Sequence, residues 1–261
     1  MSAAQEETII AYEQPLNERI RTLMRLEHLF DQASFAIAGD SAWHSRLALG
    51  TLVEILDILA RGDVKSELMK ELDRVKQTLQ RLEEKPGVDA DRLHHFIERC
   101  EQILERLRQH QGQLGASLRQ DELLSALAQR SGIAGGTCAF DLPAYHHWLQ
   151  RPPLVRREAM EDWFGILRGV RESTELILGL VRESATPRPQ TARDGVYQRN
   201  LDRNTPYQMV RVELPPGNPC FAEISGSKHF VTIRFLEQTN TADRATPAGR
   251  DVEFHLRCCM L

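Results

Sequence analysis

The sequence of 261 residues is 41% hydrophobic, which is enough to bury a sizeable core without disulfides or metals. Its 33 basic and 37 acidic residues give a net charge of −4, which argues against the strongly basic surface that nucleic-acid binding requires. No stretch approaches the roughly 18 consecutive apolar residues of a membrane span, and the acidic N-terminal residues do not resemble a secretory signal. We therefore expect no nucleic-acid partner and no membrane insertion.

Cysteine usage predicts a reducing, cytoplasmic environment. The five cysteines are an odd number, and none is spaced Cys-x-x-Cys from another. The adjacent Cys258 and Cys259 end a predicted strand, where one buried and one exposed thiol is a simpler interpretation than a soft-metal site.

Apolar periodicity predicts a long helical region. Residues 7–13 are expected to form a short strand, after which Pro15 suits the first position of a helix because its missing N–H is not needed there. From Leu16 onward the apolar residues recur every three or four positions. Gly62 is expected in the left-handed conformation after the second helix, and Pro86 and Gly87 are expected to end the third. The predicted helices cover 16–33, 47–62, 63–85, 91–109, 119–130 and 154–184.

After the two prolines of residues 185–195, the hydrophobic pattern alternates with a period of two. This pattern predicts antiparallel strands at 209–214, 229–237 and 251–259. We place strand 7–13 in the same sheet, since a lone strand leaves its backbone groups unpaired. The predicted fold is α+β, with a helical domain at 15–186 and an antiparallel β domain made from 1–14 and 187–261.

The stretch GGTCAFDLPAYHHWLQ, residues 135–150, gathers reactive residue types. Asp141 is expected to cap a short helix, and its two adjacent histidines, His146 and His147, point about 100° apart, which does not suit one metal ion. The two glycines fit a left-handed turn better than a phosphate loop. A cysteine-dependent hydrolase that uses Cys138 and His146 remains the alternative function, because both residue types needed for nucleophilic catalysis are present.

Tryptophans and arginines supply further candidates. Trp43, Trp148 and Trp163 stand at helical spacing among apolar residues and are expected in the core or in an interface. Arg21, Arg25 and His28 form a row on the first helix, which is either plain solvent surface or a contact surface.

Several segments resemble the ZapD family of bacterial cell division proteins. They are YEQPLNERIRTLMRLEHLF, ILARGDVKSELMKELDR, GGTCAFDLPAYHHWL, ISGSKHFVTIRF and DVEFHLRCC, and their order and spacing extend over most of the chain. The resemblance implies a non-enzymatic homodimer without a cofactor. Such a protein binds the C-terminal tail of FtsZ, cross-links FtsZ filaments into bundles and acts in the cytoplasm at the division site.

The resemblance also suggests where FtsZ would bind, because the segments RTLMR, ARG, LRQDE and DLPAYHHWL match the family. We expect basic residues there to speed and orient the encounter with FtsZ, so that binding weakens with salt. If His146 takes part, bundling should depend on pH; the alternative is a helix histidine held by packing. The predicted contact residues are Arg21, Arg25, Arg61, Arg119, His146 and Arg151.

Overall fold

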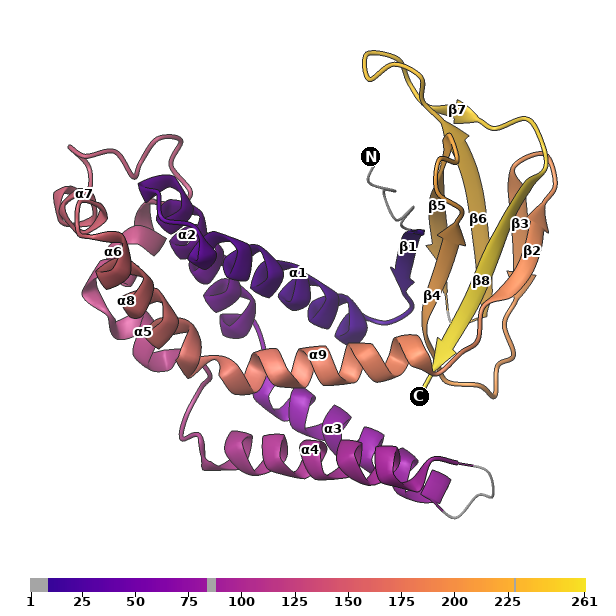
Figure 1. Ribbon diagram of the computed structural model, residues 1–261, viewed down its shortest axis with the longest axis horizontal. Coiled ribbons are helices and arrows are strands. Elements are labelled where there is room, and N and C mark those ends of the chain that lie inside the picture. The colour runs from indigo at the N-terminus through magenta and orange to yellow at the C-terminus, as the bar shows by residue number, and fades with distance from the viewer. Residues whose placement is uncertain (1–8, 84–87, 228) are drawn as a thin grey trace, which may run out of the picture. The chain divides into compact units, whose positions relative to one another are not determined.

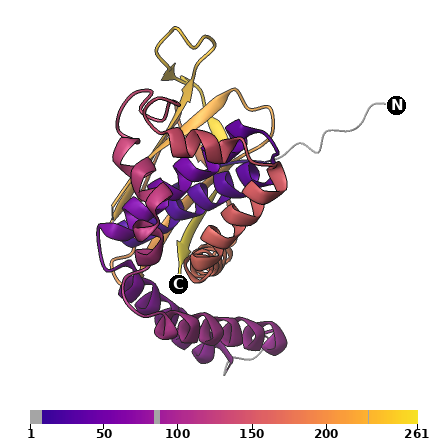
Figure 2. The same cartoon turned by 90° about the vertical axis from the view of Figure 1, so that its left-hand side faces the viewer.

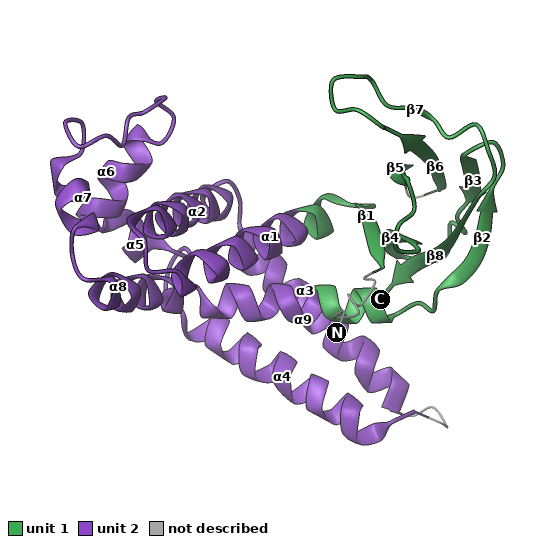
Figure 3. Ribbon diagram, turned by 45° about the horizontal axis from the view of Figure 1, so that its top comes forward, with its two compact units in different colours: residues 1–21, 178–261 green, residues 22–177 purple. Residues whose placement is uncertain are grey.

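A computed structural model describes residues 9–83, 88–227 and 229–261 of the protein. These residues form nine helices and eight strands, an α+β arrangement that confirms the predicted fold class (Figure 1). The chain divides into two compact units (Figure 3). Unit 1 comprises residues 1–21 and 178–261 and contains the strands, and unit 2 comprises residues 22–177 and is helical.

Several helices of unit 2 pack against α2. Gln32 of α1 donates a hydrogen bond to Thr51 of α2 (2.7 Å), and the rings of Phe35 and His44 meet at 6.0 Å, so α1 and α2 run antiparallel. Helices α6, α7 and α8 also contact α2. The helices are α1 (Glu18–Ala38), α2 (Ala42–Ala60), α3 (Val64–Glu83), α4 (Ala90–Gln109), α5 (Ala116–Gln120), α6 (Glu122–Arg130), α7 (Pro143–Leu149), α8 (Pro153–Ile166) and α9 (Arg168–Glu183), the last of which ends in unit 1.

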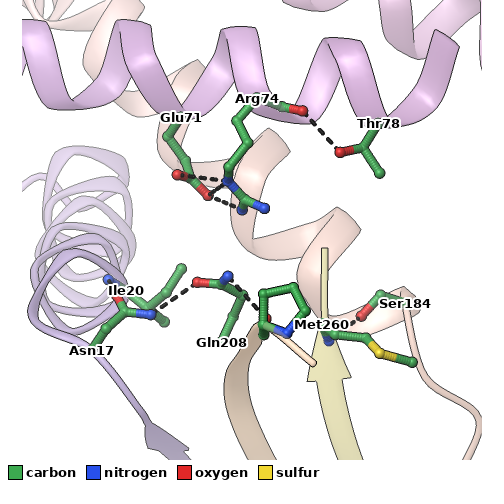
Figure 4. Close-up of polar contacts among 9 residues, drawn as sticks. Asn17, Ile20, Glu71, Arg74, Thr78, Ser184, Gln208 and Met260 are labelled. Atoms are coloured by element: carbon green, nitrogen blue, oxygen red, sulfur yellow. Dashed lines mark hydrogen bonds and ion pairs between the residues drawn. The ribbon is translucent and has the colours of Figure 1, made fainter. Parts of the chain in front are cut away.

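Helices α3 and α4 form a hairpin and lie side by side (Figure 2). Their facing stripes are apolar, and Lys76 reaches Glu101 across the pair at 3.6 Å. Glu71 of α3 is buried, and Arg74, one turn later, forms an ion pair with it (Figure 4). The predicted ends of α3 at Pro86 and Gly87 lie outside the described residues.

Unit 1 contains two four-stranded antiparallel sheets. One has the order β1-β4-β8-β2; in the other, β6 lies between β3 and β5 and also pairs with β7. Buried side chains from both sheets, including Val212, Phe235 and Phe254, form one core. The strands are β1 (Ile10–Pro15), β2 (Arg188–Ala192), β3 (Val196–Asn200), β4 (Tyr207–Leu214), β5 (Cys220–Gly226), β6 (Phe230–Glu237), β7 (Thr246–Pro247) and β8 (Val252–Met260).

The placement of the N-terminal strand in the sheet is confirmed, because β1 pairs with β4. Polar contacts close unit 1 where helices meet strands: Asn17 donates to Gln208 (2.9 Å), and Ser184 accepts from the N–H of Met260 (2.9 Å) (Figure 4). The prediction of a single sheet is wrong. Strands β2, β3, β5 and β7 were not expected, and β2 falls inside the predicted break at 185–195. Pro189 is accommodated because β2 is an edge strand, where a missing N–H is tolerated.

Two predicted helix ends are wrong. Pro15 is the last residue of β1, paired opposite Met209, and does not begin the helix. Asn17 caps α1 instead, because its side-chain oxygen accepts the N–H of Ile20 at 2.9 Å. Gly62 does not have a positive φ; α2 ends at Arg61, whose N–H donates to Ile58 in a tightened last turn.

Two predicted helices are each divided in two. Residues 119–130 belong to α5 and α6, because Asp121 leaves the helical conformation and its carboxylate caps α6 at the N–H of Leu124 (3.0 Å). Residues 154–184 form α8 and α9, which meet at the fully buried Leu167. Glycines at 165 and 169 flank this break, and glycine weakens a helix interior.

Candidate functional site

The stretch 135–150 is a series of turns followed by α7. Gly135 has the left-handed φ of 72° that was predicted for this turn, and the N–H of Cys138 returns to its carbonyl at 3.0 Å. The predicted cap is wrong: Leu142 occupies the N-cap position of α7. The Asp141 carboxylate instead forms a 3.4 Å ion pair with Arg130, which joins the turn to the end of α6.

Arg46 of α2 holds this stretch in place. Its guanidinium lies 5.5 Å from the ring of Trp43 and 5.1 Å from the ring of Tyr145, and it donates to the carbonyl of Thr137 at 3.2 Å. Burial raises the pKa of Tyr145 to about 12. Trp148 is also buried, as predicted, and packs on Trp163 with a ring separation of 5.7 Å.

The exposed face of α7 carries His146 and His147. Cys138 is exposed as well, but in the described part of the chain no hydrogen bond joins its sulfur to His146. Nucleophilic catalysis requires a base within hydrogen-bond reach, and Asp141 is paired with Arg130 and orients neither group. The geometry therefore does not assemble a catalytic triad from the predicted residues. Within the described residues, no three histidine, cysteine or acidic side chains gather as a metal site would require.

Arg61 and Arg119 lie at the corner where α2 ends. Gln113 links Arg119 to the last turn of α2, since its side chain donates to the carbonyl of Leu59 (3.3 Å) and accepts from Arg119 (2.9 Å). Lys65 donates to the carbonyl of His110 from the start of α3. Arg61 is exposed, whereas Arg119 is half-buried in the last turn of α5 and does not begin a helix as predicted.

At this corner the backbone of Gly115 lies close to the side chain of Leu56. Gly115 has a φ of 70°, and a Cβ at this position would lie 2.5 Å from a methyl carbon of Leu56. Only glycine satisfies both the conformation and the space. The side chain of Asp63 caps α3 by accepting the N–H of Ser66 at 3.1 Å, and hydrogen bonding from the hydroxyl and the N–H of Ser66 lowers the pKa of Asp63. The corner is thus tightly built from three chain segments.

The arginine row of α1 lies on the surface, with Arg21 half-buried. Arg21 forms a 3.5 Å ion pair with the exposed Glu18, and a pair so open to solvent adds little to stability. Arg25 and His28 are exposed, and in the described residues no acidic side chain pairs with Arg25. Arg25 is therefore the member of the row most available to an acidic partner.

The structure separates the predicted contact residues into two groups. Because α1 and α2 are antiparallel, Arg25 lies at the end of this helix pair where Arg61 and Arg119 also lie. His146 belongs to α7, which contacts α2 at Arg46, and the exposed Arg151 follows α7. Arg46 and Arg61 are separated by 15 helical positions, about 22 Å along α2.

Sequence reasoning missed Arg46 and Gln113. Arg46 follows Trp43 by three positions on one helix, a spacing that brings side chains together, so a local signal existed. The role of Gln113 had no such signal, because its partners Leu59 and Arg119 meet only in the folded chain.

The fold and surface define an α+β protein with a helical unit that carries basic side chains at one end and buried aromatic residues behind its α7 face. A family model described as "ZapD: Cell division protein" matches residues 24–234. The chain belongs to this family of cell division proteins. No described helix is long and apolar enough to cross a membrane.

Similar proteins match nearly the whole chain. Cell division protein ZapD of Methylococcus capsulatus is 43% identical over 252 residues, which cover 97% of this chain and 98% of its own length. Cell division protein ZapD of Dechloromonas aromatica is 38% identical over 253 residues, 97% of this chain and 100% of that protein. The protein of the same name from Aromatoleum aromaticum is also 38% identical over 253 residues, covering 97% and 98%.

Proposed function

We propose that this protein is a non-enzymatic, cytoplasmic cell division factor that binds the C-terminal tail of FtsZ. As a homodimer it would cross-link FtsZ filaments at the division site and so promote assembly of the Z ring. The observation that carries the proposal is the match to ZapD proteins over 97% of the chain. A match of this extent includes residues of both units.

Physical reasoning supports a dimeric cross-linker. A two-fold dimer presents two equivalent binding faces, and a filament presents many tails at regular spacing. A modest affinity at each face then becomes a strong overall attachment, because the second binding event occurs at a high effective concentration. No activated side chain is needed for this activity.

We assign the first contact to Arg25, Arg61 and Arg119, and to Arg21, which is one turn before Arg25 on α1. Arg25 and Arg61 are exposed, and Arg119 is oriented by Gln113. Cations placed in this way favour an acidic or carboxylate-bearing ligand, and their main effect is on the association rate. His146 and Arg151 would form a second, separate contact near α7.

The test is a sedimentation assay with purified FtsZ. The wild-type protein is expected to pellet with FtsZ filaments and bundle them, less so as salt increases, and to do neither with FtsZ that lacks its tail. Arg25→Glu is expected to reduce bundling at least tenfold. Arg203→Glu is the matched control, because Arg203 is also exposed but lies in a turn of unit 1.

Circular dichroism must show that both variants are folded. Equal bundling by Arg25→Glu and Arg203→Glu would remove Arg25 from the contact. If the wild-type protein pelleted tailless FtsZ as well as full-length FtsZ, tail recognition itself would be refuted.

A further inference from the structure

Unit 1 carries a cavity of about 720 Å³ on the sheet β1-β4-β8-β2. Its walls come from β2, β4 and β8, which lie side by side (Figure 3), and from the turn that follows β4. On β8 the side chains of Val252 and Phe254 belong to the core, so the alternate residues Glu253 and His255 point away from it. Sites for small ligands have volumes of roughly 300–1,000 Å³, and this cavity is within that range.

Much of the cavity wall is apolar. Pro189 of β2 and Pro215 in the turn after β4 are both exposed, and Ile9, just before β1, is 57% exposed. Prolines have no N–H to donate, so this part of the wall offers apolar contact and little hydrogen bonding. A ligand that fills the cavity therefore needs an apolar stem.

Two carboxylates give the cavity its polar character. Glu253 is exposed and forms no ion pair with any described residue. The side chain of Glu213 is only 7% exposed, and its Oε1 accepts from Arg211 (2.9 Å) and lies 3.0 Å from Nε of Arg257. Its Oε2 accepts no hydrogen bond from the described part of the chain. Glu253 thus offers an unpaired negative charge, and Glu213 offers a free acceptor oxygen.

Strand register places these two carboxylates on the same face of the sheet. Glu213 of β4 is paired directly opposite His255 of β8, and Glu253 comes two residues before His255. Side chains in such a diagonal relation are roughly 7–8 Å apart at their bases. Among the described residues that line the cavity there is no lysine or arginine. The cavity is therefore complementary to a ligand with positive charge at its ends, and an anion would be repelled.

We propose that this cavity binds a linear aliphatic diamine or polyamine. One ammonium group pairs with the carboxylate of Glu253, and a second donates to the free Oε2 of Glu213. The methylene chain between them lies against Pro189 and Pro215, as the stem of a lysine lies along apolar surface while its charge stays polar. The proposal goes beyond the function in cell division and does not depend on it, because no residue of this cavity is among those assigned to FtsZ.

The test is isothermal titration calorimetry of the full chain with putrescine, a diamine with a four-carbon chain. The titration is run at pH 8, above the range in which histidine ordinarily gains its charge. The wild type is expected to bind one putrescine per chain, more weakly as NaCl is added. Glu253→Gln is expected to raise the Kd about tenfold or more, as expected for one lost hydrogen bond between charged groups.

A matched control separates this site from general attraction to an acidic protein. Glu223 is also an exposed carboxylate of unit 1, but it belongs to β5 and does not line the cavity. Glu223→Gln should leave the Kd for putrescine unchanged. Equal weakening by Glu223→Gln and Glu253→Gln would overturn the proposed site.

A second variant changes the space and keeps every charge. Thr191 of β2 is exposed and is paired opposite Glu253, so Thr191→Trp should fill part of the cavity. This variant should also weaken putrescine binding, and it decides the matter if circular dichroism shows that Glu253→Gln is misfolded. Unchanged binding by the folded Thr191→Trp would contradict the location.

The diol of the same chain length tests whether charge is recognised. Butanediol has the same four-carbon stem and a hydroxyl at each end, and it should bind at least ten times more weakly than putrescine, because hydroxyls cannot pair with Glu253 as ammonium groups do. Equal affinity for the diol and the diamine, or a wild type that binds no putrescine, would refute the proposal.

Discussion

Glu13 should be a main determinant of the stability of unit 1. It lies on β1 with its side chain only 12% exposed, and it accepts hydrogen bonds from Arg182 of α9 (2.9 and 2.8 Å) and from Arg211 of β4. Burial alone would raise the pKa of Glu13, but the bonds and charges of these two arginines outweigh it and lower that pKa below 4.5. We predict that Glu13→Gln is destabilising.

The magnitude follows from the two charged hydrogen-bonded pairs that the substitution removes. Each is worth roughly 1.5–3 kcal/mol when enclosed, but the arginine side chains are about one-quarter exposed, so water partly replaces the lost oxygen atoms. We expect a loss of about 2–3 kcal/mol of unfolding free energy at pH 7. This corresponds to a decrease of roughly 4–12 °C in the melting temperature.

The pH dependence gives the stricter test. Because folding lowers the pKa of Glu13, its contribution is complete above about pH 4.5 and is lost as the pH falls through the folded-state pKa. Urea denaturation of the wild type and Glu13→Gln should show the full difference at pH 7 and a narrowing difference below pH 4. Glu253→Gln, an exposed carboxylate on β8, should change stability by less than about 0.5 kcal/mol. A difference that stayed constant to pH 3 would refute the assigned ionisation.

Three further predictions concern unit 2 and the thiols. Gly115→Ala should lower the free energy of unfolding by about 1–3 kcal/mol, because the added Cβ would collide with Leu56. A urea denaturation midpoint equal to that of the wild type would contradict this contact. Asp121→Ala should cost about 1 kcal/mol by removing the cap of α6, and an unchanged melting temperature would count against the cap. Ellman's reagent at pH 8 should modify the exposed Cys138 first and the buried Cys259 only on unfolding, because burial raises the pKa of Cys259 to about 12; a fast phase that persists in Cys138→Ser would disprove this order.

Long apolar repeats located most of the helices and the major strands. The stripe from Leu16 to Ala33 is buried as predicted, and in β6 the buried residues Val231, Ile233 and Phe235 alternate with more exposed neighbours. These elements could be predicted from their own residues, because each must bury one face and the spacing of its apolar residues indicates which face is buried. The same local pattern could not locate β2, since its Pro189 and polar residues acquire a strand conformation only by pairing with β8.

The candidate site was less predictable than the fold. The sequence indicated which cations to consider, but their grouping depends on the antiparallel packing of α1 and α2 and on the path by which Gln113 returns to Leu59. Neither is encoded within one helical repeat.

Local spacing and the order of the matching segments therefore specify the α+β class, the amphipathic helices and the family. Tertiary structure decided that Asp141 pairs with Arg130, that Arg46 joins Trp43 to Tyr145, and that Trp43 stays exposed. The partners in these contacts come from different helices and loops. Their choice depends on which surfaces are left after the core has packed, and the pattern along any single segment does not contain that information.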